Sequence, residues 1–282
     1  MTQTSVLFMA TGDISFGWAV EKVIRKHGYD HLFAAVAPIL KPADLVLANL
    51  EGPITTRGVP VAKTTRFRYH PSCLAAIKRA GIDAVCVANN HTLDYGRIGL
   101  QDTLKHLQKQ GIPYMGAGLN ENLAHQPLIL RYGGLSIGFL AYLEYPYVGV
   151  VYDGGLATVA RATPHLISKD IEQLRDKVDV VVVSFHWGKE FDLRPNRQQK
   201  RLAYLAIDAG ADLILGHHPH VLQPSEIYKD RLIAYSLGNF VFAMHKPPRN
   251  RSTILQCRLS PNKVDNIEFI PLQIKKCCPQ PL

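Results

Sequence analysis

The sequence predicts an α/β fold in which several parallel strands end at one edge of a sheet. Short apolar segments of strand length recur near residues 6, 45, 84, 181 and 213, and segments that can form helices separate them. The stretch 178–185 is dominated by valine, which is typical of a central strand buried on both faces. Polar side chains follow directly after these strands, at the edge where α/β proteins gather their ligand sites.

The composition allows a sizeable core and favours acidic partners. The chain has 282 residues, of which 47% are hydrophobic and 20% charged, and it shows no repeat or linker, so we expect one domain over 1–282. The formal charge of +9 favours phosphate esters or polyanions, although a basic solvated surface accounts for it equally well. Nucleic acid is a disfavoured partner, because the basic residues are spread out and no nucleic-acid motif is present.

The two ends of the chain give expectations about location and order. No Lys or Arg precedes the first apolar segment and no apolar run is long enough to cross a bilayer, so we expect a cytoplasmic protein without a membrane segment. The five cysteines lack zinc-finger spacing, and their odd number favours free thiols. Cys277 and Cys278 lie in a proline-rich tail that we expect to be flexible from about residue 273.

The first two predicted strands each lead to a carboxylate. The strand Val6–Ala10 precedes Asp13, and the strand Asp44–Ala48 precedes Asn49 and Glu51. Either acidic residue alone could be an ordinary turn residue. Helices are expected over Ser15–His27, with Ser15 as the N-cap, and over Asp30–Leu40, with Asp30 as the cap.

A basic segment follows, from Lys63 to His70. Basic and other side chains alternate in it, so Arg66, Arg68 and His70 share one face of an extended chain. This face is either an anion-binding rim near the site or a solvated loop.

Two amides and an imidazole follow the third predicted strand, Ile82–Ala88. They are Asn89, Asn90 and His91, with Asp94 three residues further on. Packing does not explain such a group at a strand end, and the alternative is a polar turn in which Asp94 caps the next helix. The neighbouring helices are expected over Pro71–Ala80 and Arg97–Gln110.

The middle of the chain carries no cofactor motif. Gly116-Ala117-Gly118 lacks the third glycine and the helix of a dinucleotide fingerprint. A hairpin is expected over Leu128–Tyr142. The segment 143–163 is aromatic and aperiodic, which is typical of a lid or functional loop. Four tyrosines here either line a pocket or lie on the surface: Tyr142, Tyr145, Tyr147 and Tyr152.

Histidines dominate the last two strand ends. The valine-rich strand leads to His186 and then Glu190, and the strand Ala211–Leu215 leads to His217, His218 and His220. Three histidines in four residues are costly as core filler, because each ring nitrogen needs a partner. The surrounding elements are helices over Pro164–Lys177 and Arg197–Ala209, antiparallel strands over Glu226–Pro271 and a polar turn at Ser236–Phe240.

The polar residues at the strand ends can form a metal centre. Carboxylates, an amide and three imidazoles fill two adjacent sites, and mixed nitrogen and oxygen ligands suit Mn, Fe, Zn or Co better than Ca or Mg. Two ions can polarise one substrate oxygen from both sides, with His91 free to give a proton to a leaving group. No nucleophile elbow and no Walker loop offers another chemistry.

Several short motifs occur in order between residues 12 and 240. They are Gly12-Asp13, Asn49-Leu50-Glu51, Asn89-Asn90-His91 with Asp94 and Gly96, Gly116-Ala117-Gly118, His186-Trp187-Gly188 with Glu190, Gly216-His217-His218-Pro219-His220, and Ser236-Leu237-Gly238-Asn239-Phe240. This ordered set resembles the CapA family of poly-γ-glutamate capsule biosynthesis proteins, which is similar to calcineurin-type metallophosphoesterases. The resemblance implies a four-layer αββα sandwich with the site at one sheet edge.

The resemblance also implies roles for individual residues. One metal would be held by Asp13, Glu51 and His220. Glu51 would bridge to a second metal, whose other ligands would be Asn90, His186 and His218. His91 takes the place of the catalytic histidine, and Asp94 is assigned a catalytic role beside it. The phosphoesterase pattern has a His where this chain has Ser15 and a bridging Asp where it has Glu51, which predicts a weakened first site.

Two functions remain open at this point. The first is a metal-dependent hydrolase with two divalent ions (Mn, Fe or Zn) and no organic cofactor, acting on a phosphate ester or an amide bond of an acidic substrate such as poly-γ-glutamate. The second is a non-catalytic factor that binds this polyanion or assembles capsule. The substrate-binding candidates are Asn49, Lys63, Arg66, Arg68, His217, Glu190 and Asn239.

Overall fold

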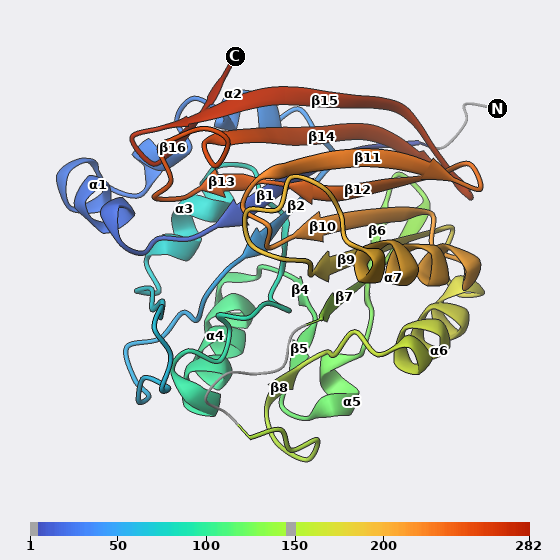
Figure 1. Cartoon of the computed structure of the whole chain (residues 1–282), viewed down its shortest axis with the longest axis horizontal. Coiled ribbons are helices and arrows are strands. Elements are labelled where there is room, and N and C mark those ends of the chain that lie inside the picture. Colours follow the sequence, from blue (N-terminus) through green and yellow to red (C-terminus); the bar gives the residue numbers. More distant parts are fainter. Residues whose placement is uncertain (1–4, 145–150) are drawn as a thin grey trace.

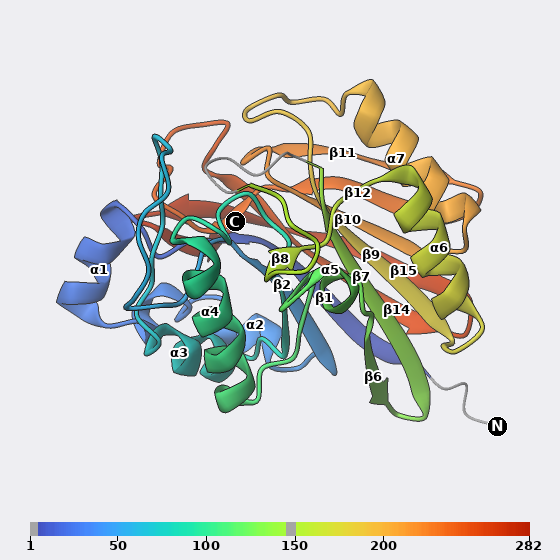
Figure 2. The same ribbon diagram turned by 90° about the horizontal axis from the view of Figure 1, so that it is seen from below.

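Two β-sheets packed face to face lie between two outer layers of helices in the computed structural model, which describes residues 5–144 and 151–282 (Figure 1). Figure 2 shows α1 to α4 on one side of the sheets and α6 and α7 on the other. This is a four-layer αββα sandwich, as predicted.

Within the described residues, the first sheet has eight strands in the order β16-β15-β14-β1-β2-β3-β4, with β13 paired to β1. The strands β1 to β4 run parallel, and β14 to β16 continue the sheet in antiparallel fashion. Their bounds are β1 Val6–Ile14, β2 Leu45–Leu50, β3 Ala84–Cys86, β4 Tyr114–Met115, β13 Asn239–Val241, β14 Arg251–Ser260, β15 Lys263–Lys275 and β16 Cys278–Pro281.

The second sheet has six strands over the same described ranges, in the order β11-β12-β10-β9-β7-β6. Its central strands β12, β10, β9 and β7 are parallel. The bounds are β6 Leu128–Tyr132, β7 Leu135–Leu143, β9 Val180–His186, β10 Leu213–His217, β11 Leu222–Tyr228 and β12 Arg231–Leu237, and a separate short pair joins β5 Ala117–Gly118 to β8 Thr158–Val159. Every residue of β9 is buried, as its valine content predicts.

The helices follow the predicted ranges closely in most places. Their bounds are α1 Ala19–His27, a 3-10 turn Asp30–Leu32, α2 Ala37–Leu40, α3 Cys73–Arg79, α4 Gly96–Gln110, α5 Glu121–Ala124, α6 Pro164–Arg175 and α7 Arg197–Asp208. Asn196 and Gln199 form a capping box at the start of α7. Among the described residues, no helix combines the length and apolar character needed to traverse a bilayer.

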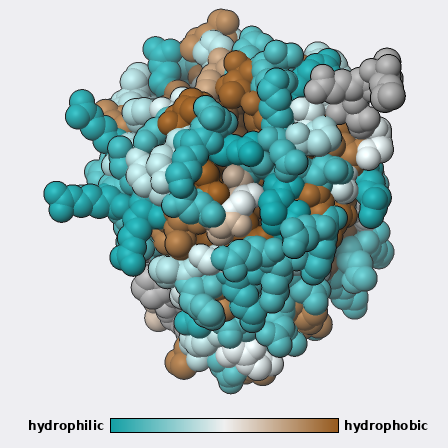
Figure 3. Space-filling model, turned by 90° about the vertical axis from the view of Figure 1, so that its right-hand side faces the viewer, coloured by the Kyte–Doolittle hydropathy of each residue, from teal (hydrophilic) through white to brown (hydrophobic). Residues whose placement is uncertain are grey.

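Three buried clusters hold the four layers together. Phe8, Phe139 and Leu215 belong to the cluster between the two sheets. A second cluster fills the space between the first sheet and α1 to α4, and a third lies between the second sheet and α6 and α7. The outer surface is polar by comparison: the face on the right of Figure 1 carries mostly hydrophilic side chains, with apolar groups in small areas and in a central hollow (Figure 3).

Three local expectations are wrong. Ser15 does not cap a helix, because α1 begins at Ala19 and the Ser15 hydroxyl instead bonds to Tyr69, with 2.7 Å between the two oxygens. The helix expected over Asp30–Leu40 is split into the 3-10 turn and α2. The tail from residue 273 forms a strand: β16 pairs with Leu272, Gln273, Ile274 and Lys275 at the end of β15.

All five cysteines are free and buried, which agrees with the free thiols expected from their spacing.

Candidate metal centre

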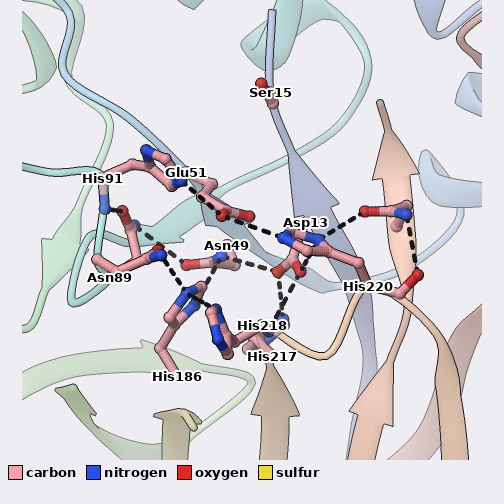
Figure 4. A network of polar contacts seen from close by, with 12 residues as sticks. Asp13, Ser15, Asn49, Glu51, Asn89, His91, His186, His217, His218 and His220 are labelled. Carbon is pink, nitrogen blue, oxygen red and sulfur yellow. Dashed lines mark hydrogen bonds and ion pairs between the residues drawn. The ribbon is translucent and has the colours of Figure 1, made fainter. Parts of the chain in front are cut away.

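Strand ends from both sheets converge on one cluster of polar side chains (Figure 4). Strand register brings several of them together, since Asp13 on β1 is the partner of Asn49 on β2 and of Asn239 on β13. In the second sheet, His186 on β9 is the partner of His217 on β10. Parallel strands therefore deliver ligands from distant parts of the sequence to the same edge, as predicted.

Asp13, Glu51 and His220 form a buried group in which one ligand atom from each residue lies within 4.8 Å of the others. Both carboxylate oxygens of Glu51 are buried without a hydrogen-bond partner in the described structure. Glu51 Oε1 lies 3.6 Å from His220 Nε2 and 3.8 Å from His91 Nε2. An unpartnered buried carboxylate is costly. A metal ion coordinated by this carboxylate removes that cost, so the donor set fits a divalent cation.

A second set of donors lies beside the first. His186 Nε2 is 2.9 Å from Asn90 Oδ1 and 3.1 Å from His218 Nδ1. Burial, with the neighbouring His218, holds the pKa of His186 well below its ordinary value. Burial, with the neighbouring His220, lowers the pKa of His218 to about 3. Both imidazoles are therefore neutral near pH 7, which is the form that binds metal ions.

Glu190 joins the centre from the solvent side. One of its carboxylate oxygens lies within 4.8 Å of a ring nitrogen of His218 and one of His220. Glu190 is exposed, whereas both histidines are buried. The residue was predicted to bind substrate, and its position makes it a candidate metal ligand as well.

Three predicted substrate-binding residues are buried behind the ligands and orient them. Asn49 donates from Nδ2 to Asp13 Oδ1 at 2.8 Å, and His217 Nδ1 lies 3.1 Å from the same oxygen. Asn239 Oδ1 is 2.9 Å from His220 Nδ1, so the Nε2 atom of His220 faces Glu51. With at most 2% of their surface exposed, Asn49, His217 and Asn239 cannot contact a substrate in this conformation, and we assign them a positioning role.

His91 and Asp94 form a buried pair next to Glu51. The distance from His91 Nδ1 to Asp94 Oδ2 is 2.6 Å, which leaves Nε2 as the ring atom that faces the centre. Burial lowers the pKa of His91, and the Asp94 carboxylate opposes this effect. Asp94 also accepts from the backbone N–H of Phe67 at 2.7 Å and from Lys63 Nζ at 3.0 Å. Through these bonds Asp94 connects the basic segment from Lys63 to His70 with the site.

Burial and mutual interactions determine the pKa values in the buried group Asp13, Glu51 and His220. Burial raises the pKa of Glu51 to about 8. Burial works against the charged form of His220, yet the Glu51 and Asp13 carboxylates raise its pKa to about 9. Burial likewise opposes the ionised form of Asp13, yet hydrogen bonds from His217 and His220 hold its pKa well below the usual range.

An open cleft of about 610 Å³ leads to the centre. It is lined by Ala62, Lys63, Thr64, Thr65, Asn90, His91 and Glu190. Among the basic residues predicted to bind an anion, Lys63 lies in this cleft. Arg66 and Arg68 do not line it: Arg66 donates to the Val61 carbonyl, and Arg68 stacks over Tyr95, 4.6 Å from the ring centre. The predicted alternation is correct, but it turns these two side chains away from the site.

The tyrosines of the aromatic segment do not line the cleft either, where they are described. The Tyr142 hydroxyl donates to Asp170, and the Tyr152 ring lies under the Arg161 guanidinium at 3.6 Å. Tyr145 and Tyr147 lie outside the described residues.

Phe191 and Arg249 near the site were not predicted, and Asn89 was part of a predicted strand-end motif without an assigned role. Asn89 donates to the Leu50 carbonyl and accepts from the backbone N–H of His91, so it shapes the turn that carries Asn90 and His91. Arg249 stacks over Phe191 at 3.8 Å, and the Phe191 ring is 6.3 Å from that of His220. The place of Asn89 in the Asn89-Asn90-His91 motif was a usable signal, whereas no local pattern indicates where Arg249 lies.

Comparison with known proteins decides the family. The family described as bacterial capsule synthesis protein PGA_cap matches residues 7–244. This chain belongs to the PGA_cap family. The PGA_cap chain is 35% identical to the PGA biosynthesis protein CapA of Bacillus subtilis, over 96% of this chain and 72% of that protein. It is 33% identical to the capsule biosynthesis protein CapA of Bacillus anthracis, over 96% of this chain and 68% of that protein. The predicted resemblance to CapA is confirmed.

A solved structure supports the fold. The NAD nucleotidase of Haemophilus influenzae aligns with 100% of the PGA_cap chain and 54% of its own length, at a TM-score of 0.53 and 12% identity. At this identity the likeness establishes a shared fold alone.

Proposed function

We propose that this PGA_cap protein is a metal-dependent hydrolase that acts on a phosphate ester or an amide bond of an acidic substrate such as poly-γ-glutamate. The observation that carries the proposal is the unpartnered Glu51 carboxylate, fully buried between His91 and His220. A buried carboxyl group without a hydrogen bond is an expensive feature in a protein core. A metal centre beside the buried His91–Asp94 pair accounts for it.

The geometry supports the following ligand roles. Asp13, Glu51 and His220 would hold one ion, and Asn90, His186 and His218 would contribute to a second. Divalent ions such as Mn, Fe or Zn would supply Lewis acidity toward a substrate oxygen. The protein's own residues would orient the substrate and move the proton.

His91 is suited to exchange a proton with the leaving group. Asp94 accepts the bond from Nδ1–H, which fixes the ring and leaves Nε2 facing the centre. Burial lowers the pKa of His91, so the imidazole is largely neutral at pH 7, and Nε2 can accept a proton from the attacking water and then pass it to the leaving group. Lys63, which lines the cleft and donates to Asp94, adds positive charge where an acidic substrate would enter.

The basic side chains around the mouth support an acidic substrate. Lys63 lies on one side of the cleft. Arg249 stacks on Phe191, which directly follows Glu190 of the cleft lining, and its backbone carbonyl accepts from Asn239, whose Oδ1 lies 2.9 Å from His220 Nδ1. Substrates that combine a scissile bond with nearby carboxylates or phosphates match this arrangement.

A second candidate is a non-catalytic factor that binds poly-γ-glutamate or assembles capsule. It is favoured by the names of the relatives, which describe biosynthesis of capsule and PGA. Both candidates use the same cleft, and they differ in what His91 does.

The two are separated by His91→Ala, assayed on metal-loaded protein with phosphate esters and poly-γ-glutamate. The matched control is His165→Ala, which removes an exposed imidazole from α6. A hydrolase loses at least about 100-fold in turnover in the first variant, the scale of a lost acid–base group, and little in the second. Wild-type protein that binds the polymer but cleaves none of these substrates favours the assembly factor.

A further inference from the structure

Glu190 is held next to the histidine turn by bonds on both sides of it in the chain. The backbone N–H of Trp187 donates to the His217 carbonyl at 3.1 Å, and that of Phe191 donates to the Pro219 carbonyl at 2.8 Å. The segment 187–191 is thus fastened to the turn that carries His218 and His220. This double attachment holds Glu190 close to both rings.

The turn before Glu190 depends on a glycine. Gly188 has a φ of 80°, and a Cβ there would come within 2.5 Å of the Gln199 side chain. Trp187 is buried and donates from Nε1 to the Tyr235 carbonyl at 3.0 Å, which anchors the start of the turn. A constrained turn therefore holds the exposed Glu190 carboxylate next to the buried imidazoles of His218 and His220.

The opposite side of the centre lacks a donor. Ser15 stands where the phosphoesterase pattern has a ligand histidine, and its hydroxyl bonds to Tyr69, whose own hydroxyl donates to the Glu51 carbonyl. Figure 4 shows Ser15 apart from the cluster of histidines and carboxylates. The centre thus has one donor fewer from β1 than the pattern requires.

His220 connects the two potential metal groups. It belongs with Asp13 and Glu51 in the first and with Glu190 and His218 in the second. The Glu51 carboxylate, buried and unpartnered, faces the same imidazole from the protein interior. This orphaned carboxylate is an observation independent of Glu190, and it points to a cation at the place where the two groups meet.

We propose that Glu190 is a ligand of the metal centre, donating a carboxylate oxygen from the solvent side to an ion that His218 and His220 also hold. The inference rests on the proposed function for the existence of the centre, and it adds a ligand that the phosphoesterase pattern does not contain. With Asp13 and Glu51, it supplies a third carboxylate to balance the charge of two divalent ions. An exposed ligand also leaves one side of the ion accessible from the cleft.

The test is Mn²⁺ binding to the full chain after chelator treatment, measured by calorimetry, with Co²⁺ absorption spectra as a second readout. Glu190→Gln is expected to lower the affinity for one equivalent of Mn²⁺ by roughly tenfold or more and to change the Co²⁺ spectrum. Glu190→Asp keeps the charge on a shorter side chain, and its Mn²⁺ affinity is expected to lie between those of the wild type and Glu190→Gln. The control Asp192→Asn removes the same charge from an exposed residue two positions away and should bind as the wild type does.

The outcomes separate the two proposals. Wild-type protein that binds no Mn²⁺, Co²⁺ or Zn²⁺ overturns the metal centre and, with it, the role of Glu190. Wild-type binding that Glu190→Gln leaves unchanged in number, affinity and spectrum overturns the role of Glu190 alone. Thermal unfolding of the chelator-treated variants is expected to match the wild type, because Glu190 is exposed. A weakened variant that also unfolds earlier without metal would make the loss a folding defect and contradict the ligand assignment.

Discussion

The Nδ1 atom of His91 lies 2.6 Å from Oδ2 of Asp94, and both side chains are almost completely buried. The bond selects the tautomer with the proton on Nδ1 and so fixes Nε2 as the reactive atom. Asp94→Asn keeps the size of the side chain but allows the opposite tautomer. We expect turnover of the metal-loaded protein to fall by about 100-fold or more, with unchanged metal content.

Asp176→Asn is the control for this variant, since it makes the same substitution at an exposed position. Loss of metal together with activity would show that Asp94 supports the centre's structure rather than the proton transfer.

Asn239 is expected to control metal affinity without touching the metal. Its Oδ1 atom is 2.9 Å from His220 Nδ1, and its Nδ2 donates to the His220 and Arg249 carbonyls. Asn239→Leu removes these bonds at similar volume, so we expect Mn²⁺ affinity to fall by about 10- to 100-fold, the scale for groups that orient ligands. Asn239→Asp keeps the acceptor for Nδ1–H and should recover part of this affinity. Equal losses in both variants would contradict an orienting role.

Asp102 on α4 provides a prediction about stability and pH. Its carboxylate accepts from Arg57 Nε at 3.0 Å and from the Thr55 hydroxyl at 2.6 Å. The hydrogen bond from Arg57 lowers the pKa of Asp102. Because the folded-state pKa lies below the unfolded value of about 3.9, this stabilisation is present above that pH and is lost as the pH falls through the folded-state pKa.

Urea unfolding of wild type and Asp102→Asn measures this effect. Since Arg57 is exposed, we expect a difference of only about 1 kcal/mol at pH 7. The difference should shrink steadily as the pH is lowered below about 4. A difference that is constant from pH 7 to pH 3.5, the acid end of the titration series, would show that the carboxylate charge has no part in it.

The convergence of Asp13, His186 and His220 was predictable from sequence because the positions of the strands bring these residues together. Each follows a buried parallel strand, and strands of this kind end at a common edge. The same reasoning could not distinguish a ligand from its support. Asn49, His217 and Asn239 are polar residues at the same strand ends and are as buried as Asp13 and His220. Only their hydrogen bonds to those two residues indicate a positioning role.

The remaining differences depend on contacts between distant parts of the chain. Ser15 is a good local N-cap, but its bond to Tyr69 prevails because both hydroxyls are buried and need a partner. The alternation in the basic segment correctly predicts that Arg68 is exposed. It could not indicate that Arg68 stacks on Tyr95 instead of facing the site. Nor could any pattern place Arg249 beside Phe191, since that contact requires the folded turn after β9.

Arg249 and Arg68 form a matched pair for testing the substrate. Both guanidinium groups are exposed and stacked on an aromatic ring, Arg249 over Phe191 and Arg68 over Tyr95. Phe191 adjoins His220, whereas Arg68 and Tyr69 line a separate pocket with Arg25 and His70. We therefore expect Arg249→Ala to raise the dissociation constant for poly-γ-glutamate by about three- to fivefold at low salt, the scale of an exposed ion pair, and Arg68→Ala to leave it unchanged.

Salt dependence completes this test. Because Arg249 is exposed and its proposed contact with the polymer is electrostatic, the difference between wild type and Arg249→Ala should largely vanish near 1 M salt, where charges are screened within about 3 Å. A greater loss of affinity in Arg68→Ala than in Arg249→Ala would indicate that the polyanion binds in the pocket beside α1, away from the metal centre. The acidic part of the substrate would then bind far from His91, and the basic rim of the cleft would need another explanation.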